Sequence, residues 1–406
     1  MTPQENSNPL KTLPRNVWAA TATSFLTDVS SEMLLTLLPL FLANVLGTPT
    51  ALIGLIEGIA ETTSSLLKLA SGWLSDRLSS RKWLAVAGYG ISAVSKPFLY
   101  FASTWGGVLL VRFADRVGKG IRTSPRDALI ADSIQPEHRG LAFGLHRAGD
   151  TAGAVLGLTL ALIVVLATQA ESVALTRETF QTLVIVSTIP ALLAVAVLIG
   201  YASDVRSEKK ASALRLSLAG FNSDFKYFLL VIAVFTLGNS ADAFLVLRAQ
   251  ERGLSVVGIT AMLITFNLVY AVLSGPLGAW SDKVGRRRLI VGGWLAYGLI
   301  YLGFAGANTG WQIWLVYALY GIYYAAVEGT AKAFVADLVP SEKRGTAYGL
   351  YNAVVGLMAL PASLLAGILW QVFGPAAPFL SGAILALIAV VMLQMRSLNA
   401  SPAHSA

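Results

Sequence analysis

The chain has 406 residues, of which 55% are hydrophobic and only 13% are charged, and its mean hydropathy is +0.66. Soluble globular domains carry about 25% charged residues, so this composition excludes them and predicts a protein embedded in a bilayer. The formal net charge of +8 is expected from basic loops beside anionic lipid, and we expect no nucleic-acid partner. The absence of cysteine excludes disulfides and thiolate metal sites.

Twelve apolar runs are long enough to cross about 30 Å of hydrocarbon as helices of about 20 residues each. Six lie in the first half of the chain, at approximately 18–44, 51–75, 83–103, 107–131, 140–167 and 180–202. Six more follow at approximately 226–247, 256–280, 289–306, 311–336, 346–370 and 375–395. The expected fold class is therefore an all-α integral membrane protein.

These runs define two expected domains, an N-terminal six-helix bundle over residues 1–202 and a C-terminal six-helix bundle over 226–406. The polar segment 203–225 joins them and, at about 23 residues, is long enough for a cytoplasmic linker but not for a further domain. Residues 1–15 lack the pattern of a cleaved signal peptide, so we expect the first helix to be retained as a span.

Lysine and arginine outside the runs concentrate in the connections on one side of the predicted membrane. The opposite side holds few, namely Arg177, Arg248 and Arg252. By the positive-inside rule, both termini are expected in the cytoplasm and the protein in the inner (plasma) membrane.

Two stretches of sequence occur twice. G-W-L-S-D-R-L-S-S-R-K at 72–82 returns as G-A-W-S-D-K-V-G-R-R-R at 278–288, an offset of 206 residues. The stretch 131–145 returns at 336–350 with an offset of 205, and keeps its Ala-Asp, Glu, Arg-Gly, Ala and Gly-Leu positions. Two separate signatures with nearly one offset predict two homologous halves in parallel, an internal symmetry from which transporters are built.

The first repeated stretch resembles the loop signature G-x-x-x-D-R/K-x-G-R-R-R of the major facilitator superfamily. The resemblance covers the whole chain and implies a bacterial transporter of twelve helices in two pseudo-symmetric six-helix bundles. The second copy is complete, whereas Ser79 stands where the first copy should have glycine, which predicts a less tight turn there. The resemblance also implies that the signature latches a cytoplasmic gate, which would comprise Gly72, Asp76, Arg77, Arg81, Lys82, Gly278, Asp282, Arg286 and Arg287.

Two further stretches bear on coupling. Residues 116–122 read R-x-x-K-G-x-R and resemble the superfamily's R-x-x-Q-G-x-G motif of helix 4, which is linked to proton coupling. Lys119 and Arg122 are departures from that motif. In helix 5, Asp150 stands where drug antiporters of the superfamily have the proline of G-P-x-x-G-G, and this departure counts against drug export.

Charged residues gather inside the predicted spans, although each costs roughly 2.5 to 3.5 kcal/mol there. Asp28 and Glu32 lie one turn apart in helix 1, and Glu57 and Glu61 one turn apart in helix 2. The fourth predicted span, 107–131, carries seven charges within an arc of about 140°, which are Arg112, Asp115, Arg116, Lys119, Arg122, Arg126 and Asp127. Because such groups face a cavity or a partner, the stripe predicts a polar cavity.

We hypothesise that Glu32 carries a proton, with Asp28 or Glu61 as its neighbour, and that Arg116 sets its pKa or holds the substrate. The full set of expected substrate-binding residues is Arg116, Lys119, Arg122, Asp242, Glu328, Lys332 and Asn352. The alternative, that individual charges only form interhelical salt bridges, stays open because the cations and anions of the first half nearly cancel.

The chain is accordingly predicted to be a proton-coupled secondary transporter of a small polar or anionic solute that works by rocker-switch alternating access. The alternative is divalent-metal or drug efflux by proton antiport. The usual enzyme motifs G-x-x-x-x-G-K-[ST], H-E-x-x-H and G-x-S-x-G are missing from the sequence, so we do not expect an enzyme. The expected partners are a small-molecule substrate, protons and the lipid bilayer, with no cofactor, no bound metal and a monomeric state.

Overall fold

A computed structural model describes residues 13–78, 80–135, 138–169, 172–205, 217–340 and 343–396, and of residues 76, 278, 279, 281 and 282 it describes the backbone alone. Helices make up most of these ranges. Their bounds are α1 Arg15–Leu35, α2 Leu38–Leu40 with a π-helical turn Phe41–Val45, α3 Thr50–Leu78, α4 Lys82–Ser95 with a 3₁₀ helix Lys96–Phe101, α5 Trp105–Asp132, α6 Arg139–Gln169, α7 Arg177–Tyr201, α8 Ser223–Gly238, α9 Ala243–Glu251, α10 Val256–Val284, α11 Arg286–Gly306, α12 Gly310–Leu338, α13 Arg344–Phe373 and α14 Ala377–Met395.

The helices form the twelve expected spans within the described residues. Eight of these spans are long and apolar enough to cross a membrane by length and composition. α3 and α5, with 29 and 28 residues, are also long enough to span a membrane, and they carry the predicted charges. The third span changes from α-helix to 3₁₀ helix at Lys96, next to Pro97, which cannot donate a helical hydrogen bond.

The first and seventh spans are broken, although the sequence predicted continuous helices over 18–44 and 226–247. α1 ends at Leu35, and the chain continues as α2 and a π-helical turn, while α8 ends at Gly238 and α9 begins at Ala243. Polar residues interrupt the seventh span at Asn239, Ser240 and Asp242, and such side chains compete with helical hydrogen bonds. The breaks occupy corresponding places in the two halves, and irregular backbone at membrane depth is tolerated only inside protein or beside a polar cavity.

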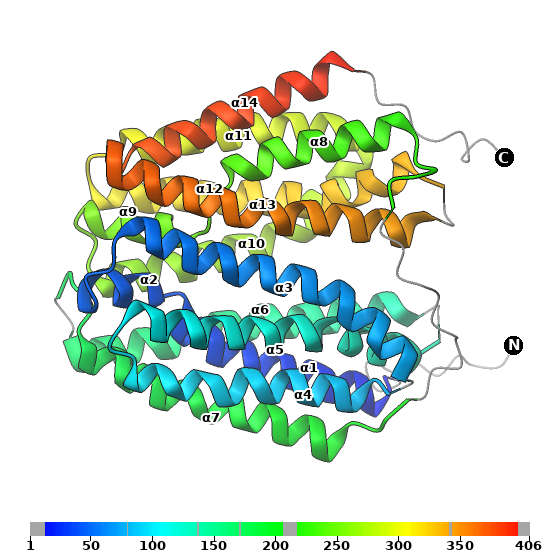
Figure 1. Cartoon of the computed structure of the whole chain (residues 1–406), viewed down its shortest axis with the longest axis horizontal. Helices are drawn as coiled ribbons and strands as arrows, with labels where there is room; N and C mark the ends of the chain where they lie inside the picture. The colour runs from blue at the N-terminus through cyan, green and yellow to red at the C-terminus, as the bar shows by residue number, and fades with distance from the viewer. Residues whose placement is uncertain are drawn as a thin grey trace, which may run out of the picture.

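The two halves of the chain lie side by side, α1–α7 in the lower part of Figure 1 and α8–α14 in the upper part. They meet where α3 packs on α13 and α6 on α10. α1 begins and α14 ends at one end of the molecule, which we call the terminal end, and the connection between α9 and α10 lies at the other, which we call the loop end. Here α2 and α3 contact α9, so the halves touch at the loop end.

Glycines bring paired helices into close contact. A Cβ on Gly54 of α3 would overlap the backbone oxygen of Ser363 in α13, and one on Gly153 of α6 would lie 2.5 Å from that of Phe25 in α1. At the α3–α13 contact the Thr50 hydroxyl donates to the Gly367 carbonyl at 3.1 Å. Small residues at such crossings let backbones approach, which is how helices associate within lipid.

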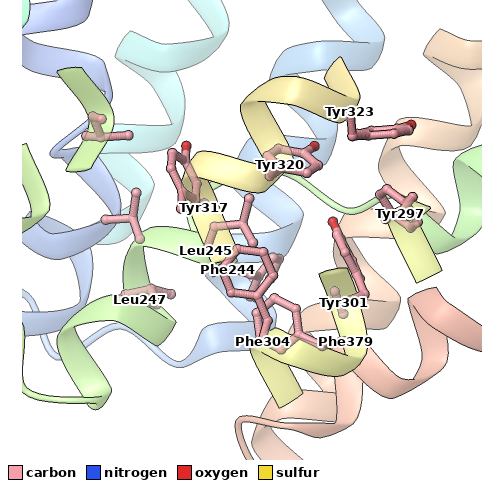
Figure 2. Close-up of a cluster of buried hydrophobic side chains, with 14 of the residues drawn as sticks. Phe244, Leu245, Leu247, Tyr297, Tyr301, Phe304, Tyr317, Tyr320, Tyr323 and Phe379 are labelled. Atoms are coloured by element: carbon pink, nitrogen blue, oxygen red, sulfur yellow. The ribbon is translucent and has the colours of Figure 1, made fainter. Parts of the chain in front are cut away.

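Aromatic side chains form much of the core of the second half (Figure 2). The Tyr297 hydroxyl donates to the Gly238 carbonyl at 3.0 Å, at the point where α8 ends. Arg248, one of the few basic residues outside the predicted cytoplasmic face, is fully buried. Its guanidinium donates to the carbonyls of Phe304 and Ala305 at 3.0 and 2.8 Å. Both groups satisfy backbone oxygens that helix ends leave without partners.

Candidate functional site

A cavity of about 660 Å³ lies between the two halves, and both broken spans contribute to its wall. The halves meet at the loop end, where α2 packs on α9 and the Gln250 side chain donates to the Val173 carbonyl at 2.7 Å. Eight of the predicted site residues line the cavity: Asp28, Glu32, Glu61, Arg116, Lys119, Arg122, Asp242 and Glu328. Lys332 and Asn352 are not part of this lining. Lys332 instead lies 3.5 Å from Glu328, and Asn352 is exposed on α13.

The charged wall of the cavity comes from α1, α3 and α5. Arg112 and Glu57 form an ion pair at 2.7 Å, with side-chain exposures of only 5% and 11%. The predicted stripe on α5 does face the cavity as far as Arg122, whereas Arg126 turns to Asp127 at 2.8 Å and to the Ser24 hydroxyl at 3.0 Å. The stripe therefore combines lining charges with a structural pair nearer the terminal end.

The cations of the stripe differ in how they are paired. Arg122 donates to the Ser92 hydroxyl at 2.9 Å and lies over the ring of Tyr89, 4.5 Å from its centroid. Among the described residues, by contrast, the buried Nε of Arg116 has no hydrogen-bond partner, and neither do Nε and Nη1 of Arg112. Buried donors are normally paired, so these guanidinium groups retain capacity for an acceptor from outside the protein.

A polar bridge joins the halves on the terminal side of the cavity. Arg147 of α6 donates to the Tyr270 hydroxyl and lies 3.5 Å from Glu328. Tyr270 in turn donates to Glu328 at 2.8 Å. The Arg147 side chain remains 58% exposed although it lines the cavity, which indicates that the cavity opens toward the terminal end.

The wall from the second half is polar at the break, and α10 and α12 add several aromatic rings. Asn239, Ser240 and Asp242 come from the break, while the rings of Phe266 and Tyr324 come from α10 and α12. Asp242 was predicted from the sequence, whereas Phe266 and Tyr270 were missed as site residues. Their signal was weak, because a lone aromatic residue in an apolar helix is more often part of the core.

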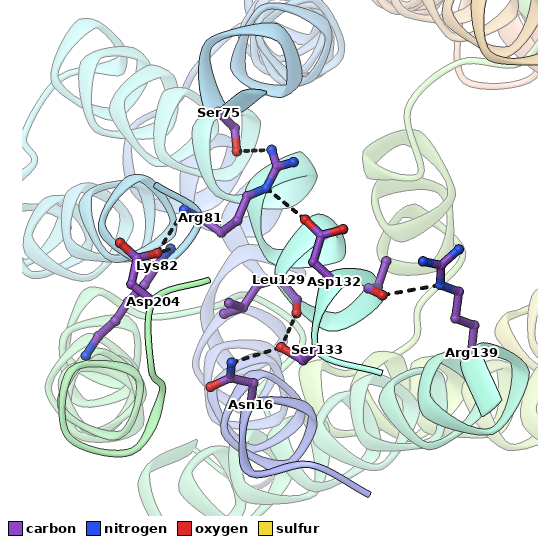
Figure 3. A network of polar contacts seen from close by, with 10 residues as sticks. Asn16, Ser75, Arg81, Lys82, Leu129, Asp132, Ser133, Arg139 and Asp204 are labelled. Atoms are coloured by element: carbon purple, nitrogen blue, oxygen red, sulfur yellow. Dashed lines mark hydrogen bonds and ion pairs between the residues drawn. The ribbon is translucent and has the colours of Figure 1, made fainter. Parts of the chain in front are cut away.

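The first copy of the loop signature lies at the terminal end, in a network of polar contacts (Figure 3). Arg81 is buried and contacts Asp132 at 3.2 Å and the Ser75 hydroxyl at 2.7 Å. Lys82 donates to the Ile199 carbonyl at 2.7 Å. Arg77 lies over the ring of Trp73, 5.3 Å from its centroid. These contacts all lie within the first half.

The second copy repeats the central ion pair. Arg286 contacts Asp337 at 2.6 Å, and Arg287 donates to the Leu393 carbonyl at 2.7 Å. Gly285 alone separates α10 from α11 and has φ +94°, a conformation that favours glycine. This second turn is therefore tight, as its complete signature predicts.

Some residues of the proposed gate fall outside the described part of the chain. The backbones of Gly72 and Gly278 lie in α3 and α10, whereas the side chains of Asp76 and Asp282 are not described. The less tight first turn was predicted at Ser79, which also lies outside the described residues.

A bundle of twelve spans around a central polar cavity defines a multi-pass membrane protein of the transporter class. The sequence profile described as Major Facilitator Superfamily matches residues 20–247 and again 216–405. The chain is 37% identical over 396 residues to an uncharacterised MFS-type transporter of Methanocaldococcus jannaschii, covering 96% of this chain and 97% of that protein. This chain therefore belongs to the Major Facilitator Superfamily, as the loop signatures predicted.

More distant similarities agree with this family. An uncharacterised protein of Mycobacterium tuberculosis is 26% identical over 338 residues, 80% of each chain. The crystal structure of the nucleoside transporter NupG has a TM-score of 0.73 at 15% identity, and covers 94% of this chain and 98% of that one. A POT family transporter in complex with 5-aminolevulinic acid has a TM-score of 0.77 at 12% identity, with 94% of this chain and 95% of that one covered. At these identities the structures establish the shared fold alone.

Proposed function

We propose that the protein is a proton-coupled secondary transporter of a small polar or anionic solute. The single observation that carries this proposal is the charge balance of the cavity lining. Five cations, Arg112, Arg116, Lys119, Arg122 and Arg147, stand among seven carboxylates, Asp28, Glu32, Glu57, Glu61, Asp115, Asp242 and Glu328.

This charge balance would couple the binding of protons by the carboxylates to the binding of an anion in the cavity. With every group ionised, the described lining carries a net charge of −2 (five cations against seven carboxylates) and repels an anion. Once Glu32 and one or two of its neighbours bind protons, the balance becomes neutral or positive and an anion is attracted. Proton binding and anion binding therefore favour each other, and linkage makes this coupling reciprocal. Glu32 is the proposed proton carrier, with Asp28 or Glu61 as its neighbour, and Arg116, Lys119 and Arg122 are the proposed anion-binding cations.

We further propose that the halves 1–202 and 226–406 rock against each other about the cavity, joined by the linker 203–225. The contact of α2 with α9 and the exposure of Arg147 support a state open at the terminal end. With the termini in the cytoplasm of a monomer in the inner membrane, this is an inward-facing state. In it, the loop signatures brace each half, and we propose that they form the cytoplasmic gate when the halves close.

Proton movement tests the proposal. Purified protein in proteoliposomes with an enclosed pH dye is exposed in turn to organic anions, amino acids and sugars, divalent metals and lipophilic cations. We expect proton movement with anions or polar solutes, and a loss of at least about ten-fold in Glu32→Gln, because an amide cannot carry the proton. Arg116→Gln should raise the concentration of anion needed for half-maximal movement.

The matched control is Glu178→Gln, which changes an exposed carboxylate in the first turn of α7 and should leave proton movement unchanged. Full proton coupling in folded Glu32→Gln protein would exclude Glu32 as the carrier. Proton movement with metals or lipophilic cations alone would favour the efflux alternative.

A further inference from the structure

The two walls of the cavity differ in chemistry. The first half contributes the charged groups of α1, α3 and α5, and the second half contributes the rings of α10 and α12 beside the carboxylates of Asp242 and Glu328. Phe266 lies at the centre of these rings, with its centroid 5.1 Å from Tyr317, 5.7 Å from Tyr320 and 5.9 Å from Tyr324. Tyr317 and Tyr320 line the cavity although they are almost fully buried (Figure 2), whereas Phe266 and Tyr324 are only partly buried. An aromatic surface is thus presented to the cavity.

The charged wall holds donors that lack an acceptor. Arg112 is 4% exposed, yet only its Nη2 is used, in the pair with Glu57. Its Nε and Nη1, together with Nε of Arg116 one turn further along α5, have no hydrogen-bond partner in the described part of the chain. An unpaired buried donor is unfavourable, and more so when it is charged. A ligand that brings anionic oxygens to this place removes that cost.

We propose that the solute is an organic anion with a flat, unsaturated ring, whose carboxylate is held by Arg112 and Arg116 and whose ring lies against Phe266 and Tyr324. This inference rests on the proposed function and narrows its substrate class. A carboxylate can accept two parallel hydrogen bonds from a guanidinium. Aromatic contacts add roughly two- to twelve-fold in affinity beyond burial of the same area, so a flat ring is preferred to a saturated ring of equal size.

Three matched ligands test this inference by calorimetric titration of the purified protein. Benzoate carries both features, cyclohexanecarboxylate keeps the charge without the flat ring, and benzamide keeps the ring without the charge. We expect benzoate to bind about five-fold more tightly than cyclohexanecarboxylate, the aromatic term expressed as an affinity ratio. Benzamide should bind at least about ten-fold more weakly than benzoate, because it leaves the guanidinium donors without a charged acceptor.

Variants assign each feature to its wall. Arg116→Gln should weaken the binding of both benzoate and cyclohexanecarboxylate by at least about ten-fold. Phe266→Leu should bring the ratio of benzoate affinity to cyclohexanecarboxylate affinity close to one. Tyr323→Phe is the matched control, because Tyr323 is a buried tyrosine of α12 that is not part of the lining. It should leave the ratio unchanged.

The two proposals fail in different ways. Benzoate that binds no more tightly than cyclohexanecarboxylate, or a preference that survives Phe266→Leu, overturns the ring assignment, while proton movement driven by aliphatic anions would leave the proposed function intact. Benzamide binding equal to that of benzoate overturns the anion assignment. If proton movement in proteoliposomes also occurs only with cations, the proposed function falls with it.

Discussion

At the scale of single residues, Asp204 shows how a side chain outside the membrane stabilises a helix that precedes it in the chain. α4 begins at Lys82 without a side-chain cap from its own N-cap residue. The Asp204 carboxylate accepts hydrogen bonds from the backbone N–H groups of Arg81 and Lys82, both at 3.0 Å (Figure 3). It also accepts one from the Ser80 hydroxyl at 2.8 Å. It therefore accepts hydrogen bonds from N–H groups that have no partner within the first turn of the helix. Its negative charge also lies at the positive end of the helix dipole, which is favourable.

These contacts predict a pH-dependent stability. Partial burial opposes ionisation, but the hydrogen bonds from Lys82, Ser80 and Arg81 outweigh it and lower the pKa of Asp204. Because the pKa is lower in the folded protein, the stabilisation is present above the ordinary aspartate pKa of about 4 and is lost as pH falls through the lowered value. Asp204→Asn should lower the free energy of unfolding by roughly 0.5 kcal/mol at neutral pH, the low end for a cap because the group is largely exposed.

Thermal unfolding in detergent between pH 7 and pH 3 measures this difference. The difference in unfolding free energy between the native protein and Asp204→Asn should become smaller toward acid pH. The difference between the native protein and Glu178→Gln should be smaller at neutral pH. A gap that widens as the pH falls would contradict the capping role.

At the scale of helices, the two kinds of glycine contact have different consequences. The α3–α13 contact joins the halves, and a Cβ on Gly54 would overlap the Ser363 backbone oxygen. The α1–α6 contact lies within the first half, and a Cβ on Gly157 would meet the Val29 backbone oxygen at 2.5 Å. Neither backbone oxygen can move unless its helix moves, so the methyl group of an alanine at either position would push the two helices apart.

Gly54→Ala should therefore shift the conformational equilibrium, while Gly157→Ala should lower stability by about 1 to 3 kcal/mol without such a shift. The chain contains no cysteine, so spin labels can be placed on cysteines introduced at Val173 and Trp311, which are 46% and 64% exposed and lie in different halves. The distance between the labels should lengthen in Gly54→Ala alone. Gly90→Ala, where a Cβ meets nothing within 4 Å, is the control, and an unchanged distance in Gly54→Ala would contradict the prediction.

At the scale of the whole molecule, the proposed rocking motion links the two ends. The halves touch through α2 and α9 at the loop end, while the Arg147–Tyr270–Glu328 bridge joins them on the terminal side of the cavity. A single rigid rocking of each half opens one end as it closes the other.

A second label pair makes this testable. Cysteines at Leu78 and Trp280, which are 56% and 49% exposed, report on the terminal end, and the pair at Val173 and Trp311 reports on the loop end. When a transported solute is added or the pH is changed, the two distances should change in opposite directions. Distances that change in the same direction would contradict rocking of two rigid halves.

Sequence alone determined the membrane class, the twelve spans, the parallel halves and the superfamily. These properties follow from composition, from apolar runs long enough to cross a bilayer and from a repeat read directly in the letters. The charged stripe on α5 was also predictable, because the helical period places its members on one face. For the same reason Glu32, Asp28, Glu61 and Arg116 could be predicted as residues facing a cavity from their spacing within the predicted helices.

Only the tertiary structure decided which groups meet across elements. Lys332 lies in α12 and Asn352 in α13, and other residues of both helices do line the cavity. The direction in which these two side chains point depends on how the helices pack, and neither side chain is part of the cavity lining. The aromatic wall at Phe266 and the cap that Asp204 provides arise from contacts between segments distant in the chain. Such contacts depend on helix packing, because the period of a helix determines which residues share its face but not which neighbour that face meets.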